Sequence, residues 1–239
     1  KEYRDWKKNP QRLPAFMSKR MNFPDGASEI AVTDYDNIKA TNRPLPDLDG
    51  WTCVAGIDFS KITDWVSVNL HFKQGNERYD ISHSWMCTGS KDIPRLKCPW
   101  KEWVEQGRLT LVDDVEIHPE IITAYLTEMK RRYAIRAVAI DDFRYALLAR
   151  YLSAIGFDRA NKNLKLVRPS DIMRVAPVVD SCFVNRWLTW GDAPELRWAA
   201  NNTKLIRYGR KLGSAGDADV GNFVYGKIEA KSRKTDPFM

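Results

Sequence analysis

The sequence has few of the features that mark membrane or secreted proteins. Its 239 residues include no run of 18 apolar residues, which excludes a transmembrane helix. The first residues, Lys1–Asp5, have no apolar stretch behind them, so we expect no signal peptide. Only four cysteines occur, at scattered positions, and none forms a C-x-x-C pair. We therefore expect reduced thiols in a cytosol, not a disulfide scaffold.

Two common kinds of catalytic motif are also missing. There is no G-x-x-x-x-G-K-[ST] segment, so the chain should not hydrolyse ATP through a P-loop. The three histidines are too scattered to suggest a catalytic dyad. Chemistry, if the chain performs any, must come from other residue types.

The composition is that of a globular protein with a basic end. Apolar residues make up 44% and charged residues 29%, with nine each of Trp, Tyr and Phe to fill a core. The net charge is +7, and Asn201–Met239 alone holds eight basic against four acidic residues. This basic segment is either a solvated face or a contact for a polyanion.

The chain changes character at Trp51. Residues 1–50 are broken by five prolines and are expected to form an arm. From residue 51 the pattern predicts three consecutive strands, at 52–59, 64–72 and 78–85, as an antiparallel meander. Further along it predicts an edge strand at 109–112, strands at 137–141 and 164–167, a hairpin of 204–208 with 222–225, and helices at 119–133, 145–155, 171–187 and 194–200. This order indicates an α/β fold with a mixed sheet and helices on both faces.

Two acids end the most apolar strands. Asp58 and Asp141 each follow four or five apolar residues, where an unpaired carboxylate is costly. If the two strands are neighbours, the acids repel, and a divalent cation such as Mg²⁺ or Mn²⁺ relieves that repulsion. Two such ions can serve phosphodiester hydrolysis. The alternative is that both acids merely cap a following turn or helix.

Two more acids could join them. Asp64 opens the second strand, six residues after Asp58, and can face the same pocket if the two strands form a hairpin. Asp236 lies in the basic segment, at the start of a helix that we expect from Thr235. Asp142 should point away from Asp141 along an extended chain.

Four segments together resemble one family. Gly56-Ile57-Asp58-Phe59-Ser60 with Asp64 is similar to the G-[IV]-D-[LF]-S-x-x-x-D opening of the nuclease domain in the large terminase subunit of tailed bacteriophages. The other three are Ala139–Arg144, an acid two residues before an aromatic and then Arg; Pro194–Trp198 with Asn201; and Lys227–Lys234 followed by Thr235-Asp236-Pro237. The match covers nearly the whole chain in the family's order.

The resemblance implies a metal-dependent endonuclease with an RNase H-like fold. It implies that the chain cuts concatemeric double-stranded DNA in the host-cell cytoplasm, with Asp58, Asp141 and Asp236 binding two Mg²⁺ or Mn²⁺ ions and Asp64 as an auxiliary acid. Contacts to the DNA backbone are expected from Arg144, Lys227, Lys231, Arg233 and Lys234. It also implies three partners: an ATPase domain, a small terminase subunit and a portal ring.

On this view the chain is part of a longer protein. The arm at residues 1–50 corresponds to the linker that leaves the ATPase domain, and residues 51–239 to the nuclease domain. Because the ATPase half is missing, we do not expect this chain to translocate DNA. Two other interpretations stay open: another RNase H-like nuclease, such as a resolvase or transposase core, and a non-catalytic module that docks on DNA or a capsid ring.

Overall fold

The computed structural model describes residues 30–60, 65–207, 223–229 and 231–238. The chain divides into two compact units, Lys1–Ile30 and Ala31–Met239, and the architecture below is that of the second. Val32, Ile38 and Leu48, from the segment before Trp51, are buried in the cores of this unit. In the part of the chain that the structure describes, no helix is both long enough and apolar enough to cross a bilayer.

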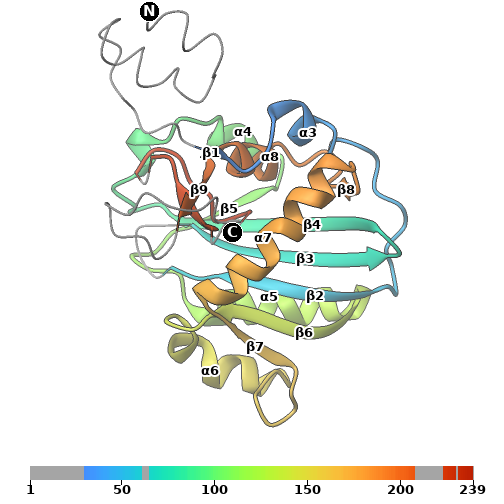
Figure 1. The fold of residues 1–239 in the computed structure, drawn as a ribbon. Coiled ribbons are helices and arrows are strands. Elements are labelled where there is room, and N and C mark those ends of the chain that lie inside the picture. Colours follow the sequence, from blue (N-terminus) through green and yellow to red (C-terminus); the bar gives the residue numbers. More distant parts are fainter. Residues whose placement is uncertain (1–29, 61–64, 208–222, 230, 239) are drawn as a thin grey trace, which may run out of the picture. The chain divides into compact units, whose positions relative to one another are not determined.

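A seven-stranded mixed sheet forms the centre of the unit (Figure 1). Its order is β5-β4-β3-β2-β6-β7, with β8 paired to β4. The predicted meander is confirmed, since β2 pairs antiparallel with β3, and β3 with β4. The strands β5, β6 and β7 add parallel pairings on both sides of it. The bounds are β2 Thr52–Asp58, β3 Val66–Gln74, β4 Glu77–Cys87, β5 Leu109–Val112, β6 Ala134–Asp141, β7 Leu164–Val167 and β8 Leu188–Thr189.

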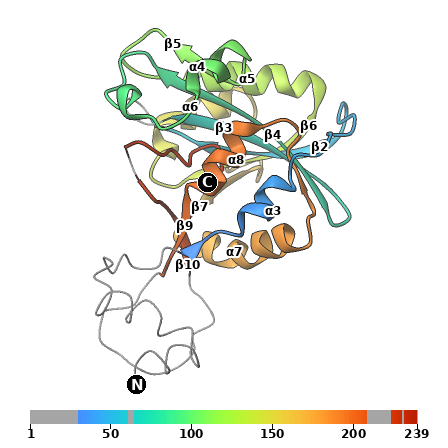
Figure 2. The same cartoon turned by 90° about the horizontal axis from the view of Figure 1, so that it is seen from above.

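Helices cover both faces of this sheet, as predicted. Figures 1 and 2 show α7 crossing one face and α5 lying against the other. On the second face, Ile122 and Leu126 of α5 and Leu148 and Leu152 of α6 share one core with the strands. On the first, Phe183 of α7 packs with residues of α3 and α8. The bounds are α3 Tyr35–Lys39, η2 Ile93–Arg95, α4 Trp100–Glu105, α5 Pro119–Arg132, α6 Tyr145–Ala154, α7 Pro169–Val184 and α8 Pro194–Asn201.

Helix ends follow from the local sequence. α5 begins with proline at its first position, where a missing N–H costs nothing, and ends with Lys130, Arg131 and Arg132, which complement the helix dipole. α7 also begins with proline, and the Asp171 carboxylate accepts the backbone N–H of Arg168 at 3.0 Å. These caps place the start of α7 directly after β7.

A second, three-stranded sheet has the order β1-β9-β10, with bounds β1 Ile30–Ala31, β9 Thr203–Arg207 and β10 Phe223–Lys227. The predicted hairpin of β9 and β10 is confirmed as an antiparallel pair.

The helix expected from Thr235 is absent, and that prediction was wrong for the described residues up to 238. The chain instead makes a turn in which the backbone N–H of Phe238 donates to the Thr235 carbonyl at 2.8 Å. Phe238 packs against Phe183, Trp190 and Tyr225. A single helical turn is marginal by itself, and these ring contacts hold Phe238 against the core.

Candidate active site at the ends of two parallel strands

Asp58 and Asp141 lie side by side at one edge of the sheet. Each is the last residue of its strand, and the preceding residues, Ile57 and Ile140, are paired in the parallel ladder of β2 and β6. Parallel neighbours in register lie about 4.8 Å apart and share a face. Ile57 and Ile140 are buried, so the two acids point to the other face together. The structure thus brings together the two acids that the sequence singled out.

The Asp141 carboxylate has a fixed orientation. Its Oδ1 accepts the backbone N–H of Phe143 at 2.7 Å, which closes a local turn after β6. Asp141 is exposed and Asp58 is half-buried. Both carboxylates are therefore placed at the surface end of an otherwise buried pair of strands.

Asp142 is directed elsewhere, as the alternation of an extended chain predicts. Its carboxylate accepts the Nε–H of Arg168 at 3.0 Å, and its backbone N–H donates to the Val167 carbonyl at 3.2 Å. These contacts tie the end of β6 to the start of α7.

Asp236 occupies a different environment. It is 3% exposed, and the Lys227 ammonium contacts its two carboxylate oxygens at 3.1 and 3.4 Å. Across residues 30–60, 65–207, 223–229 and 231–238, no three His, Cys, Asp or Glu side chains are grouped closely enough to hold a metal ion. The structure does not unite Asp236 with Asp58 and Asp141, and its role as a ligand stays a prediction. Asp64 lies outside the described residues.

The five predicted DNA-contacting cations separate into two groups. Arg144 and Lys231 are exposed, and Arg233 is half-buried, with its Nε 3.5 Å from a Glu229 oxygen. Lys227 is held by Asp236. Lys234 is 1% exposed, and its ammonium donates to Asp92 at 2.6 Å.

In this arrangement the Lys234 ammonium is buried against Asp92, and its contact with DNA stays a prediction. A buried ammonium needs a partner, and Asp92 supplies it. The partner precedes Lys234 by 142 positions, which is why sequence reasoning missed it.

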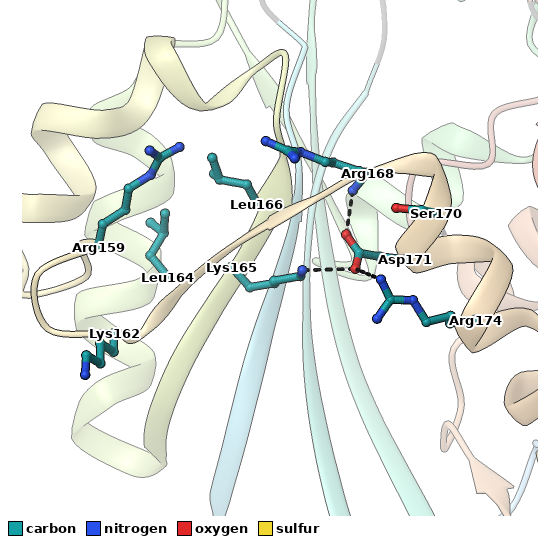
Figure 3. Close-up of a pocket in the computed structure, with 9 residues that line it drawn as sticks. All are labelled: Arg159, Lys162, Leu164, Lys165, Leu166, Arg168, Ser170, Asp171 and Arg174. Carbon is teal, nitrogen blue, oxygen red and sulfur yellow. Dashed lines mark hydrogen bonds and ion pairs between the residues drawn. The ribbon is translucent and has the colours of Figure 1, made fainter.

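Sequence reasoning also missed a concentration of positive charge beside the two acids. A groove of about 590 Å³ runs along β7, between the α6–β7 connection and the start of α7 (Figure 3). We call it the basic groove, and its lining residues are Arg159, Lys162, Leu164, Lys165, Leu166, Arg168, Ser170, Asp171 and Arg174. Five of these nine are cations. The spacing of Lys and Arg between 159 and 174 was a visible signal, but only the fold makes them line one hollow.

The sequence matches a known family. A family model described as "Terminase large subunit, endonuclease domain" matches residues 3–162. No curated protein matches the chain by sequence.

Solved structures share the fold. The large terminase of bacteriophage HK97 aligns with a TM-score of 0.70 and 17% identity over 96% of this chain and 47% of that one, so the chain spans about half its length. The large terminase nuclease of thermophilic phage G20c aligns at 0.52 with 11% identity, covering 87% and 92% of the two chains. The same nuclease with bound magnesium aligns at 0.51 with 12% identity, covering 88% and 93%. The expected RNase H-like mixed sheet is thereby confirmed.

Proposed function

Since the chain belongs to the endonuclease-domain family of terminase large subunits, we propose that it cuts concatemeric double-stranded DNA by two-metal phosphodiester hydrolysis. The observation that carries this proposal is the placement of Asp58 and Asp141 on adjacent parallel strand ends. Two carboxylates that share one face repel each other unless a cation lies between them.

The residues at this edge suit hard divalent ions. Carboxylate oxygens select Mg²⁺ or Mn²⁺ over softer metals. Asp58 and Asp141 would hold the ions, and Asp64 and Asp236 would add the further oxygens that a two-ion site needs. For Asp236, this requires its carboxylate to be free of the Lys227 ammonium. Two such ions, when bound, supply Lewis acidity for the attacking and leaving oxygens of the phosphodiester.

The protein's own groups orient the site and hold the substrate. The Phe143 N–H fixes one oxygen of Asp141, and the Arg168 guanidinium keeps Asp142 out of the pair. Arg144 and Lys231, both exposed, would contact backbone phosphates without reading bases. In this proposal the ion pairs of Lys227 and Lys234 hold the C-terminal segment in place.

The wider role follows from the family and is part of the proposal. In the host-cell cytoplasm the chain would act with an ATPase domain, a small terminase subunit and a portal ring. In this proposal hydrolysis uses only groups of this chain and the bound ions, so the activity can be tested on this chain alone.

The direct test is nicking of supercoiled plasmid by the 239-residue chain with Mn²⁺ or Mg²⁺. Cleavage should appear with either ion, stop with excess EDTA, and be abolished by Asp58→Asn or Asp141→Asn. Asp142→Asn is the matched control, since Asp142 is the adjacent residue but pairs with Arg168. Cleavage in excess chelator, or at the parent rate in either active-site variant, would overturn the two-metal proposal. Duplex binding without any cleavage would favour a docking module.

A further inference from the structure

The basic groove follows an open edge of the sheet. β7 is the last strand in the order, so no strand of the described segments pairs with its outer side. Figure 3 shows Leu164 and Leu166 on this strand between two groups of cations. Arg159 and Lys162 come from the α6–β7 connection on one side, and Arg174 comes from α7 on the other.

Positive charge exceeds negative charge in this hollow. Five cations line it, and the carboxylates that face them are Asp171, in the groove, and Asp142, at its end. Asp171 accepts hydrogen bonds from the Lys165 ammonium and the Arg168 backbone N–H, both at 3.0 Å, and lies 3.9 Å from the Arg174 guanidinium. The hydrogen bond from Lys165 is the main cause that lowers the pKa of Asp171, so this carboxylate carries a negative charge. With five cations against the two carboxylates Asp171 and Asp142, the groove has about three positive charges in excess.

Protection of the sheet edge explains only part of this pattern. Lysine on an edge strand prevents pairing with another chain, and Lys165 has that position. Arg159, Lys162 and Arg174 are not on the strand, and all three are exposed. Their convergence on one hollow instead favours a ligand with regularly spaced negative charges.

The groove begins beside the strand end that carries Asp141. Asp141 of β6 is paired with Val167 of β7, and Arg168 follows at once. From Val167 back to Leu164 the strand covers about 10 Å, at about 3.3 Å per residue. One DNA strand carries a phosphate per 3.4 Å of axis, so this length matches about three phosphates.

We propose that the basic groove binds the phosphate backbone of the double-stranded DNA that flanks the cleavage site and runs over β7. The identity of this ligand as DNA rests on the proposed function. The groove would hold the flank while Asp58 and Asp141 act on the scissile bond, and it would read no bases, because backbone contacts carry no sequence information.

Binding of a labelled duplex, measured in EDTA, separates this contact from cleavage. The groove variant is Arg159→Ala, Lys162→Ala and Arg174→Ala. A control with the same change in charge is Lys39→Ala, Lys73→Ala and Arg131→Ala, all exposed cations outside the groove. Loss of three phosphate contacts should reduce the salt slope by about 2.7 and raise Kd about 10- to 100-fold near 0.1 M salt. The control should change Kd less than about threefold. Thermal unfolding checks that all chains are folded, and the single Arg174→Glu, at a side chain 78% exposed, is the milder second variant.

The outcomes distinguish this proposal from the proposed function. If both groove variants bind the duplex with the same Kd as the parent, the proposal for the groove is overturned, even if the parent cleaves plasmid. Loss of binding in the groove variant alone would support it, even if the parent never cleaves. A parent chain that binds no duplex would also overturn the proposal. So would a second titration, with an acidic peptide of equal charge in place of the duplex, if the groove variants lost binding to that peptide and kept binding to the duplex.

Discussion

Glu195 gives the sharpest quantitative prediction, because its carboxylate is buried with little stabilisation from hydrogen bonds or nearby cations. It is 3% exposed at the second position of α8, and its Oε2 has no hydrogen-bond partner among the residues that the structure describes. The Arg108 guanidinium lies 3.9 Å from that oxygen but is committed to Asp192 at 2.6 Å. Burial therefore raises the pKa of Glu195 from 4.5 to about 7.

This pKa sets the size and the sign of the effect. Between pH 4.5 and about pH 7, the Glu195 carboxyl holds a proton in the folded chain and has released it in the unfolded chain. The free energy of unfolding therefore falls as the pH rises through this window. A difference of about 2.5 pH units, at 1.36 kcal/mol each, amounts to about 3 kcal/mol. Glu195→Gln keeps the shape without the charge. The variant should match the parent near pH 4.5 and exceed it by about 3 kcal/mol above pH 8.

Unfolding at pH 5, 6, 7 and 8, without divalent ions, measures this gap. At pH 8 the Tm of Glu195→Gln should exceed that of the parent by about 6–12 °C. Exposed Glu102 provides the matched control, and Glu102→Gln should leave the Tm close to that of the parent. His71 also titrates: burial opposes its protonation, but its hydrogen bond with Asp80 raises its pKa overall. Because His71 is present in both the parent and Glu195→Gln, its effect cancels in the difference between their Tm values. A gap that does not change with pH would refute the reasoning.

Three further predictions concern the charged residues around the site. Lys234→Ala should destabilise the fold by about 3 kcal/mol, because it removes the 2.6 Å contact to Asp92 and leaves that carboxylate with the Arg95 guanidinium at 4.0 Å. Lys231→Ala should leave denaturant unfolding unchanged and lower the salt slope of DNA binding by about 0.9. Equal stability of the two variants would contradict the assignment. Asp236→Asn should reduce cleavage by at least about 10- to 100-fold with little change in DNA affinity, and a large loss of stability at unchanged cleavage would make it a structural residue only. Asp142→Asn should change the cleavage rate less than about threefold in the plasmid assay, since an amide still accepts from Arg168; a large loss would mean that this residue serves the chemistry.

The central sheet could be predicted because its signals are local. The apolar runs before Asp58 and Asp141 and the alternation through β3 are visible in a short window, and they specify buried strands. Once the two strands are neighbours, the acids meet without further information. Proline at the first position of α5 marks a helix start in the same local way, whereas α7 begins at Pro169, two residues before the predicted start.

The remaining features depend on partners far away in the chain. Ile38 looked like part of a loose arm, but it shares a core with Phe183. Phe238, near the end of the sequence, packs against the same Phe183. The burial of Lys234 depends on Asp92, which precedes it by 142 positions. No window of sequence contains these pairs.

The account rests on Asp58 and Asp141 binding divalent ions together. Calorimetric titration of Mn²⁺ into the parent chain and into Asp141→Asn tests this most directly, with Asp142→Asn as control. The parent and the control should bind Mn²⁺ alike, and Asp141→Asn should lose at least about tenfold in affinity. Equal Mn²⁺ affinity in the parent and Asp141→Asn, or no binding to the parent, would contradict the account.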